Sequence, residues 1–174
     1  MAASKKSAVD NYANIAAVTA IPSAADAFKA VKFAFPFSIM DKMGLLLSRI
    51  EYFIDAFGYL NSANDYVYAG LSTASSLTSI SDPADPMIVD SIRLIRVDYG
   101  TAASGDLVQT PIIRDFSTLP GGGLLVAPNP LYFWTQTNGA SGVISCQCRL
   151  WYTYMELSTD DYWQLVESRR VISS

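Results

Sequence analysis

Apolar and polar residues alternate along much of this chain, and a period of two is typical of a β-strand with one buried face. The clearest example is the segment 143–155, where apolar or aromatic residues occupy the even-numbered positions and polar residues occupy most of the odd-numbered ones. The even-numbered side chains are therefore predicted to face the core: Ile144, Cys146, Cys148, Leu150, Tyr152 and Tyr154.

The segment 45–57 alternates in the same way, with Ile50 and Ile54 on the predicted inner face and Glu51 and Asp55 on the outer one. A half-buried strand is the favoured interpretation. The alternative is an amphipathic helix, in which Glu51 and Asp55 would be neighbours on a solvated face.

Proline, glycine, asparagine and clustered serine residues divide the rest of the chain into further short apolar segments. Pro36 favours an edge position or a bulge for the segment that contains it. Strands are predicted at 28–39, 65–71, 87–99, 107–116 and 124–137, the last broken by Pro128 and Pro130. A loop is predicted at 72–86, and turns at 119–123 and 138–139.

This spacing predicts an all-β fold, an antiparallel β-sandwich of about eight strands. The long strands and the long connection at 72–86 favour the jelly-roll type. An immunoglobulin sandwich is disfavoured, because the chain lacks the spacing of two cysteines around a tryptophan that such domains carry.

The two ends of the chain differ from the predicted sandwich. Residues 1–27 are mostly small, and they are either a disordered tail or an extended arm that becomes ordered only against neighbouring subunits. Residues 28–174 are predicted to form the jelly-roll domain. Its C-terminal helix is predicted at 158–170, because Ser158 and Asp161 form a loose capping box. Contacts between subunits are predicted at Ile15, Val18, Ile21, Trp151 and Trp163.

The composition indicates an unusually apolar surface. Hydrophobic residues make up 51% of the 174 residues and charged residues 16%, whereas about 25% is charged in an average domain. Such a chain should fold and should expose more apolar surface than a monomer normally leaves in water. The net charge of −4 has the wrong sign for a protein that mainly coats nucleic acid. No apolar run approaches the roughly 18 residues of a transmembrane helix, and the N-terminus is a poor signal peptide.

Little catalytic chemistry is available, so neither an enzyme activity nor a cofactor is predicted. The chain has no histidine, which excludes imidazole bases and histidine metal sites. On a strand, Glu51 and Asp55 would lie about 13 Å apart, too far for a glycosidase pair. The glycines at 121–123 lack the lysine and hydroxyl residue of a phosphate loop. Asp82 and Asp85 are weak candidates for a structural Ca²⁺ site, since aspartate before proline usually serves only to form a turn.

Exposed aromatic residues leave two functions open. Trp151 lies on the face opposite the predicted core row, and such residues form either protein contact surfaces or carbohydrate-binding platforms. A carbohydrate-binding jelly roll that uses exposed Trp and Tyr is therefore the alternative. Lys5 and Lys6 are weak candidates for facing a genome, because they would neutralise only about two phosphates.

The segments GGGLLVAPNPLYFW (121–134) and CRLWYTYMELSTDDYWQLVESRR (148–170) follow an arm of small residues. This layout resembles the single jelly-roll capsid proteins of small icosahedral viruses known from environmental samples. The resemblance implies a virion subunit that assembles in the host cell into a closed shell, with many copies of itself and with or without a second capsid protein. It brings no catalytic residues. An Arg-rich arm is lacking, so contact with nucleic acid is expected to be weak or indirect.

Overall fold

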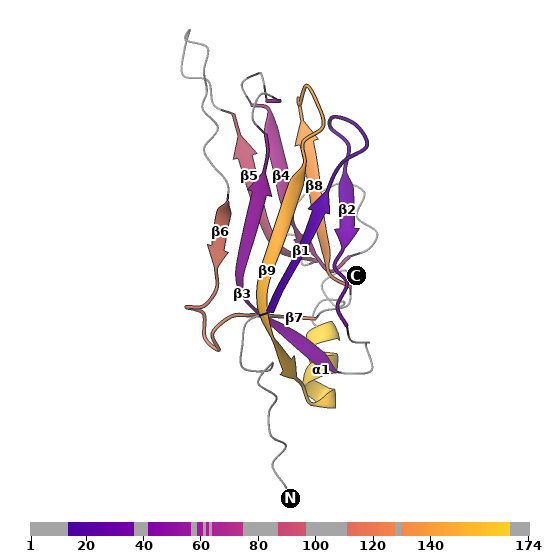
Figure 1. The fold of residues 1–174 in the computed structure, drawn as a ribbon. Helices are drawn as coiled ribbons and strands as arrows, with labels where there is room; N and C mark the ends of the chain where they lie inside the picture. Colours follow the sequence, from indigo (N-terminus) through magenta and orange to yellow (C-terminus); the bar gives the residue numbers. More distant parts are fainter. Residues whose placement is uncertain are drawn as a thin grey trace, which may run out of the picture.

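The computed structural model is a β-sandwich, in which two antiparallel sheets pack face to face and a helix follows the last strand (Figure 1). The first sheet contains β1 (Asn14–Ala20), β3 (Met43–Ile54), β6 (Ile112–Asp115), β7 (Leu124–Val126) and β9 (Cys146–Glu156). The second contains β2 (Lys29–Lys32), β4 (Tyr66–Ser72), β5 (Ile88–Ile95) and β8 (Tyr132–Asn138). The helix, α1, comprises Thr159–Glu167. The structure describes residues 14–36, 42–56, 59–60, 62, 64–74, 87–96, 111–127 and 130–167.

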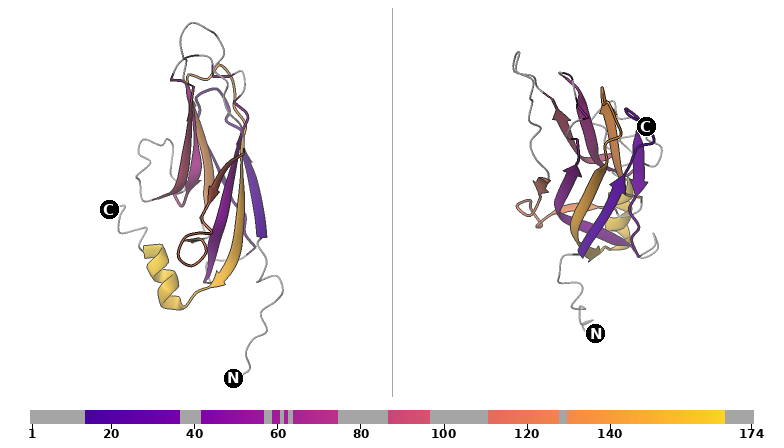
Figure 2. Two further views of the ribbon diagram at one scale, coloured as in Figure 1. Left: turned by 90° about the vertical axis from the view of Figure 1, so that its left-hand side faces the viewer. Right: turned by 45° about the horizontal axis from the view of Figure 1, so that its top comes forward.

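The strand order identifies the sandwich as a jelly roll. The first sheet has the order β1-β9-β3-β6, with β7 also paired to β3, and the second has the order β2-β8-β4-β5. The outermost strands in the sequence therefore pair with each other, then the next ones inward, until β4 pairs with β5. Such nesting is what one long antiparallel ribbon produces when it wraps into two sheets. The left view of Figure 2 shows the two layers edge-on. The predicted fold class is confirmed.

The segment 45–57 forms most of β3, so the helical alternative is wrong. Ile50, Tyr52 and Ile54 are buried between the sheets, as the alternation predicts. A bulge at Ser48 interrupts the register of β3 against β9 between Leu47 and Arg49. The Ser48 hydroxyl donates a hydrogen bond to the carbonyl of Trp151 across this irregularity, at 3.2 Å. The bulge keeps apolar side chains inside on both of its sides.

β9 lies in the centre of the first sheet and supplies much of the core. Ile144, Cys146, Cys148, Leu150 and Tyr152 are buried. Tyr154, the last member of the predicted row, is only partly buried. Facing them from the second sheet are fully buried side chains of β4 and β8, among them Val67, Leu71 and Phe133.

The N-terminal segment corrects one expectation. Asn14–Ala20 pairs along its whole length with β9 of the same chain. This part of the segment is therefore ordered without contact with a neighbouring subunit. Burial explains the difference, because Ala16 and Val18 pack against the core and Ala20 is fully buried. Residues 1–13 lie outside the described part of the chain. The division at residue 27 into arm and jelly-roll domain stays a prediction.

Several strands are shorter than the apolar segments that predicted them. Pro128 and Pro130 separate β7 from β8, as expected for residues that cannot donate to a ladder. The turn at 119–123 follows β6, and Gly121 and Gly122 adopt φ angles of 89° and 79°, which favour glycine. Of the predicted loop at 72–86 and the strand at 107–116, residues 75–86 and 107–110 fall outside the described residues.

α1 lies at the lower end of the sandwich in Figure 1. The Ser158 hydroxyl accepts a hydrogen bond from the backbone N–H of Asp161 at 3.1 Å, which confirms the predicted N-cap. Tyr162 is buried and anchors the helix. Residues 168–170 of the predicted helix are not among the described residues. Within the described chain no helix is long and apolar enough to span a membrane.

Candidate contact surfaces

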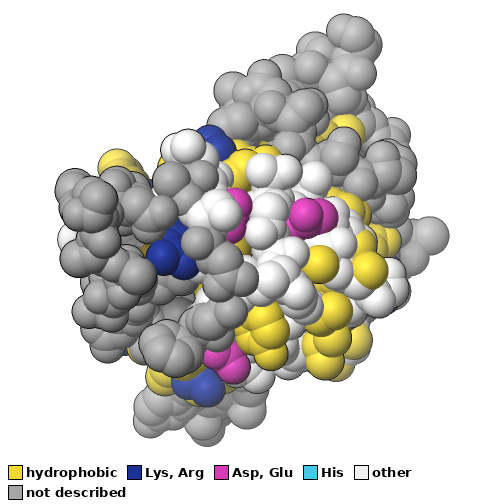
Figure 3. All heavy atoms as spheres, turned by 90° about the horizontal axis from the view of Figure 1, so that it is seen from above, with side chains coloured by type: hydrophobic (Ala, Val, Ile, Leu, Met, Phe, Trp, Pro, Cys, Tyr) yellow, Lys and Arg dark blue, Asp and Glu magenta, His cyan; other side chains and the backbone are white. Residues whose placement is uncertain are grey.

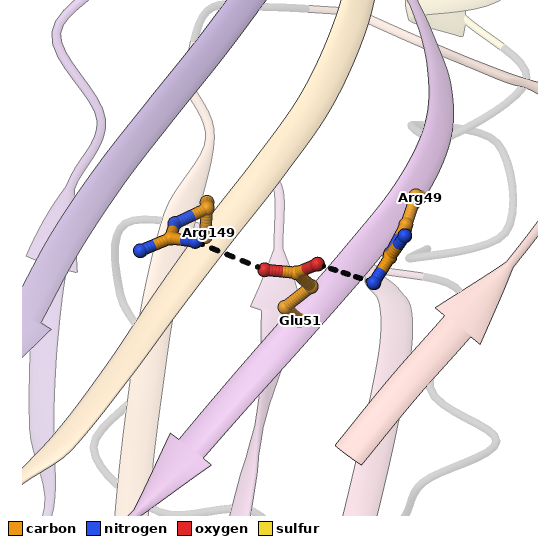
Figure 4. A network of polar contacts seen from close by, with 3 residues as sticks. All are labelled: Arg49, Glu51 and Arg149. Atoms are coloured by element: carbon orange, nitrogen blue, oxygen red, sulfur yellow. Dashed lines mark hydrogen bonds and ion pairs between the residues drawn. The ribbon is translucent and has the colours of Figure 1, made fainter. Parts of the chain in front are cut away.

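The outer face of the first sheet carries a network of charged residues centred on Glu51 (Figure 4). Glu51 in β3 lies directly opposite Arg149 in β9, and its carboxylate is 3.3 Å from that guanidinium. Arg49, two residues earlier in β3, approaches the other carboxylate oxygen at 2.6 Å. The side chain of Glu51 is only 6% exposed, so both cations offset the cost of burying its charge.

Aromatic rings flank this network on both sides. The Arg49 guanidinium carbon lies 5.8 Å from the ring centre of Trp151, and the Arg149 carbon lies 5.1 Å from that of Phe53. Cations over aromatic faces attract the ring electrons. Around Glu51 the outer face therefore consists of guanidinium and ring surfaces that already contact one another. Trp151 lies on this face, as the alternation predicts, and its role in subunit contact stays a prediction.

The outer face of the second sheet is built around Trp134. The indole is fully buried: it lies across Gly70, stacks with Phe28 at 6.4 Å between ring centres, and meets Tyr68 edge to face at 5.1 Å. Next to it the Arg93 guanidinium carbon lies 4.1 Å from the ring centre of Tyr66. These rings contact one another and Arg93, so little of their surface is free to contact another molecule.

A buried polar clasp joins the two sheets at the β5 and β6 edges. Tyr52 donates a hydrogen bond from its hydroxyl to Asp90 at 2.9 Å, and Arg114 approaches the other Asp90 oxygen at 3.1 Å. Burial, with a smaller contribution from the neighbouring Cys148 and Asp90, raises the pKa of Tyr52. The hydroxyl therefore stays protonated and acts as a donor. The arrangement is structural, because each polar group is satisfied within the clasp.

Asp26 holds the loops together at the upper end of the sandwich. Its carboxylate accepts hydrogen bonds from the Thr137 hydroxyl at 3.1 Å and from the backbone N–H groups of Gly139 and Ala140 at 3.1 and 3.0 Å. Asp26 itself has a φ of 59°, a conformation that Asp tolerates better than most residues. The loop between β1 and β2 is thereby fastened to the turn between β8 and β9.

Exposed apolar side chains are spread over the molecule. Figure 3 looks down on the upper end, where hydrophobic side chains gather on one side with acidic groups beside them. The backbone of this end is joined by a hydrogen bond from the N–H of Ser141 to the carbonyl of Tyr59 at 2.9 Å. The contact residues predicted from the sequence do not include most of these positions, because they were chosen only among aromatic residues and in the N-terminal segment. Among the described residues, the exposed large hydrophobic ones are Ile15, Ile21, Tyr59, Ile95, Ile113, Leu119, Val143, Met155 and Trp163.

The residues predicted to contact other subunits differ in exposure, and Trp151, described above, is half-buried. Ile15, Ile21 and Trp163 are exposed, the last with 48% of its surface accessible. Val18 is half-buried and packs against the core, because it faces the opposite side of β1. The candidates for genome contact and for Ca²⁺ lie outside the described residues: Lys5, Lys6, Asp82 and Asp85. Within the described residues, no three His, Cys, Asp or Glu side chains are grouped as a metal site would need.

Cys146 and Cys148 should be unreactive in the folded protein. Both are free and buried. Burial raises the pKa of Cys146 to about 11, a shift that the nearby Thr135 hydroxyl only partly opposes, and burial also raises the pKa of Cys148. At pH 8 only about one Cys146 thiol in a thousand would be ionised. We expect no measurable reaction with a disulfide reagent under native conditions and reaction of both thiols in denaturant; rapid native reaction would contradict the burial.

The fold defines this chain as an antiparallel jelly roll. No protein-family model matches it, and no characterised protein matches it in sequence. A chain from the X-ray structure of tomato aspermy virus is similar in structure, with a TM-score of 0.42 and 11% identity, over 90% of this chain and 84% of that chain. A chain from the single-particle structure of maize chlorotic mottle virus has a TM-score of 0.28 and 10% identity, over 84% of this chain and 97% of that one. At these scores the similarity carries no argument about function.

Proposed function

We propose that this chain is the structural subunit of an icosahedral viral capsid, in which many copies of it enclose a genome. The distribution of exposed apolar side chains is the observation that supports this proposal. They lie on both sheets and at both ends of the sandwich: Ile113 on the first sheet, Ile95 at the end of β5, Val143 at the upper end and Trp163 at the lower end. A subunit of a closed shell must bury apolar surface on several sides at once.

Charge supports the same proposal. The ionic groups on the outer face of the first sheet are already paired within the chain, as the contacts of Glu51 with Arg49 and Arg149 show. Placing a neighbouring subunit over paired charges costs less desolvation free energy than covering single ones. With 16% charged residues in the chain, copies also repel each other weakly.

Carbohydrate binding, the alternative function, has less support in the structure. A sugar platform needs the open face of a Trp or Tyr ring. Trp134 is fully buried, the Trp151 ring faces Arg49, and the Tyr66 ring faces Arg93. Two aromatic side chains of the described chain are exposed, but Trp163 lies on α1 rather than in a groove of a sheet, and the ring of Tyr59 lies against Gly142 in a loop.

The remaining expectations about the shell are part of the proposal. Lys5 and Lys6 would face the genome and make a weak electrostatic contribution, with a salt dependence that corresponds to about two phosphate contacts. Asp82 and Asp85 would hold Ca²⁺ if metal ions bridge subunits. A second capsid protein in the same shell is compatible with the surfaces described above.

The full chain should assemble when it is purified and concentrated. We expect sedimentation and negative-stain microscopy to show closed particles many times heavier than the 18.9 kDa chain. Replacing Trp163 with serine should lower the yield of particles, because this exposed side chain is predicted to lie in a contact. Gln164→Ser, at the adjacent exposed position, is the matched control and should assemble normally. A chain that stays monomeric at high concentration in both low and high salt would contradict the proposal.

A further inference from the structure

β1 is an edge strand without the usual protection against pairing. Within the described residues it pairs on one side only, with β9. Edge strands of soluble proteins normally carry charged residues, proline or a bulge, which prevent another strand from adding to the sheet. Asn14–Ala20, with the sequence NIAAVTA, contains no charged residue and no proline, and its register against β9 is regular throughout.

The other described edge strands are short or carry such protection, and β7, which pairs only with β3, has just three residues. β2 has Lys29 and Lys32 at its two ends. β6 has only four residues, two of which are Arg114 and Asp115. β5 carries Arg93, and its pairing with β4 contains a register shift. Among the described edge strands, β1 is therefore the only long one without a charged residue, a proline or an irregular register.

The two most exposed large hydrophobic residues of the described chain lie near the start of this strand and directly after its last residue. Ile15 is 53% exposed and Ile21 is 58% exposed. Ile15 lies opposite Trp151 on β9, and Ile21, six positions further on, has the same phase, so in a β1 extended by one residue both side chains would project from the same face of the first sheet. Exposed apolar residues on an unprotected edge indicate a surface that a partner covers.

The sequence of β1 is complementary to itself in one antiparallel register. With Val18 opposite Val18 of a second copy, Ile15 faces Ile21, Ala16 faces Ala20 and Ala17 faces Thr19. The same pairs recur on the other side of the two-fold axis. Directly opposed residues of an antiparallel pair have Cβ atoms about 5 Å apart, so both Ile15–Ile21 pairs would bury their exposed surface.

We infer that β1 pairs antiparallel with β1 of a second copy of this chain, in the register that places the two Val18 residues opposite each other. The result is a two-fold contact that continues the first sheet from one subunit into the next. On its outer face, Trp151, Ile15 and Ile21 of the second copy form one apolar row. Lys29 and Lys32 on the nearby edge of β2 limit the pairing to the first sheet. The inference rests on the proposed function for the expectation that copies of the chain meet.

A cysteine at position 18 tests both the pairing and its register. The full-length Val18→Cys protein, oxidised at neutral pH, should give a disulfide-linked dimer on a non-reducing gel, because a disulfide needs Cα atoms no more than about 7 Å apart. The matched control is Ala16→Cys, which places a cysteine on the same side of β1. In the proposed register the two introduced residues of this variant lie about 13 Å apart and should not cross-link. Val18 lies directly opposite the free native Cys148 on β9, so both variants are made in a Cys146→Ala, Cys148→Ala background, in which no disulfide can form within one chain.

A charge on the same edge gives an independent measurement. Thr19→Lys places a lysine at an exposed position of β1 and should weaken dimerisation at least tenfold, whereas Thr118→Lys, the same change at an exposed position in the turn after β6, should leave the dimer constant unchanged. Circular dichroism establishes that each variant is folded. Cross-linking at position 16 but not 18 overturns the register, and cross-linking at neither position overturns the pairing. Shells without cross-linking leave the capsid proposal standing, while cross-linked dimers without shells support the pairing and contradict the capsid.

Discussion

Replacing Gly70 with alanine is expected to lower the free energy of unfolding by about 3 kcal/mol or more, because the added methyl group has no room. Gly70 lies in β4, between β8 and β5. A Cβ atom there would lie 2.6 Å from Cζ2 of the buried Trp134 and 3.1 Å from the Cα of Ser91, and it would collide with the carbonyl oxygen of Asp90. Two of these three neighbours are backbone atoms, which cannot move aside without disturbing the pairing with β5. Urea denaturation measures the loss.

Gly44→Ala is the matched control for this substitution. Gly44 is also a buried strand residue, but the nearest atoms to its Cβ position are Cδ1 of Leu125 at 2.9 Å and Cδ1 of Leu157 at 3.1 Å. These are the ends of rotatable side chains, so we expect a loss below about 1 kcal/mol. Equal losses for the two variants would show that the contact with Trp134 and the β5 backbone is not what requires glycine at position 70.

Arg114→Ala is expected to lower the free energy of unfolding by about 2–3 kcal/mol, since it leaves a buried carboxylate without its cation. The Asp90 side chain is 6% exposed, and without Arg114 its remaining partner in the clasp is the Tyr52 hydroxyl. The Arg114 side chain is itself about half exposed, so solvent screens part of the interaction and the expected loss is at the low end for a buried pair. Thermal and urea unfolding should both report it.

Two further variants separate the buried charge from simple loss of an arginine. Adding Asp90→Asn to Arg114→Ala should restore part of the lost stability, because a neutral amide does not require a cation. Arg93→Ala, which removes an arginine on β5 that contacts the Tyr66 ring, should cost no more than about 1 kcal/mol. If the double variant is less stable than Arg114→Ala alone, the uncompensated charge of Asp90 is not the cause.

The contact between Asp90 and Arg114 could be predicted from the sequence only in part. Asp90 occupies the same phase of its strand as the inward-facing Ile92 and Leu94, and Arg114 occupies the same phase as the inward-facing Ile112. A charged residue in the apolar phase of a strand indicates a buried partner. The sequence of β5 and the sequence of β6 each carry this signal. Which two strands bring the charges together depends on how the sheets pack.

Glu51 is a similar case on the outer face. The alternation correctly placed it away from the core, and an outward glutamate is normally solvated. The structure buries it because Arg149 lies directly opposite on β9 and Arg49 follows the Ser48 bulge. Neither the pairing of β3 with β9 nor the bulge can be read from the local pattern.

The amino-acid sequence by itself determined the all-β class, the inward row of β9, the breaks at Pro128 and Pro130 and the cap of α1, because each depends on neighbours within a few residues. Only the tertiary structure decided that Asn14–Ala20 is a strand of its own sheet and that Val18 faces inward while Ile15 and Ile21 stay outside. The side chains of this segment are so small that the local sequence pattern does not predict their burial. It becomes a strand because β9, more than a hundred residues later, offers a free edge and a core to cover.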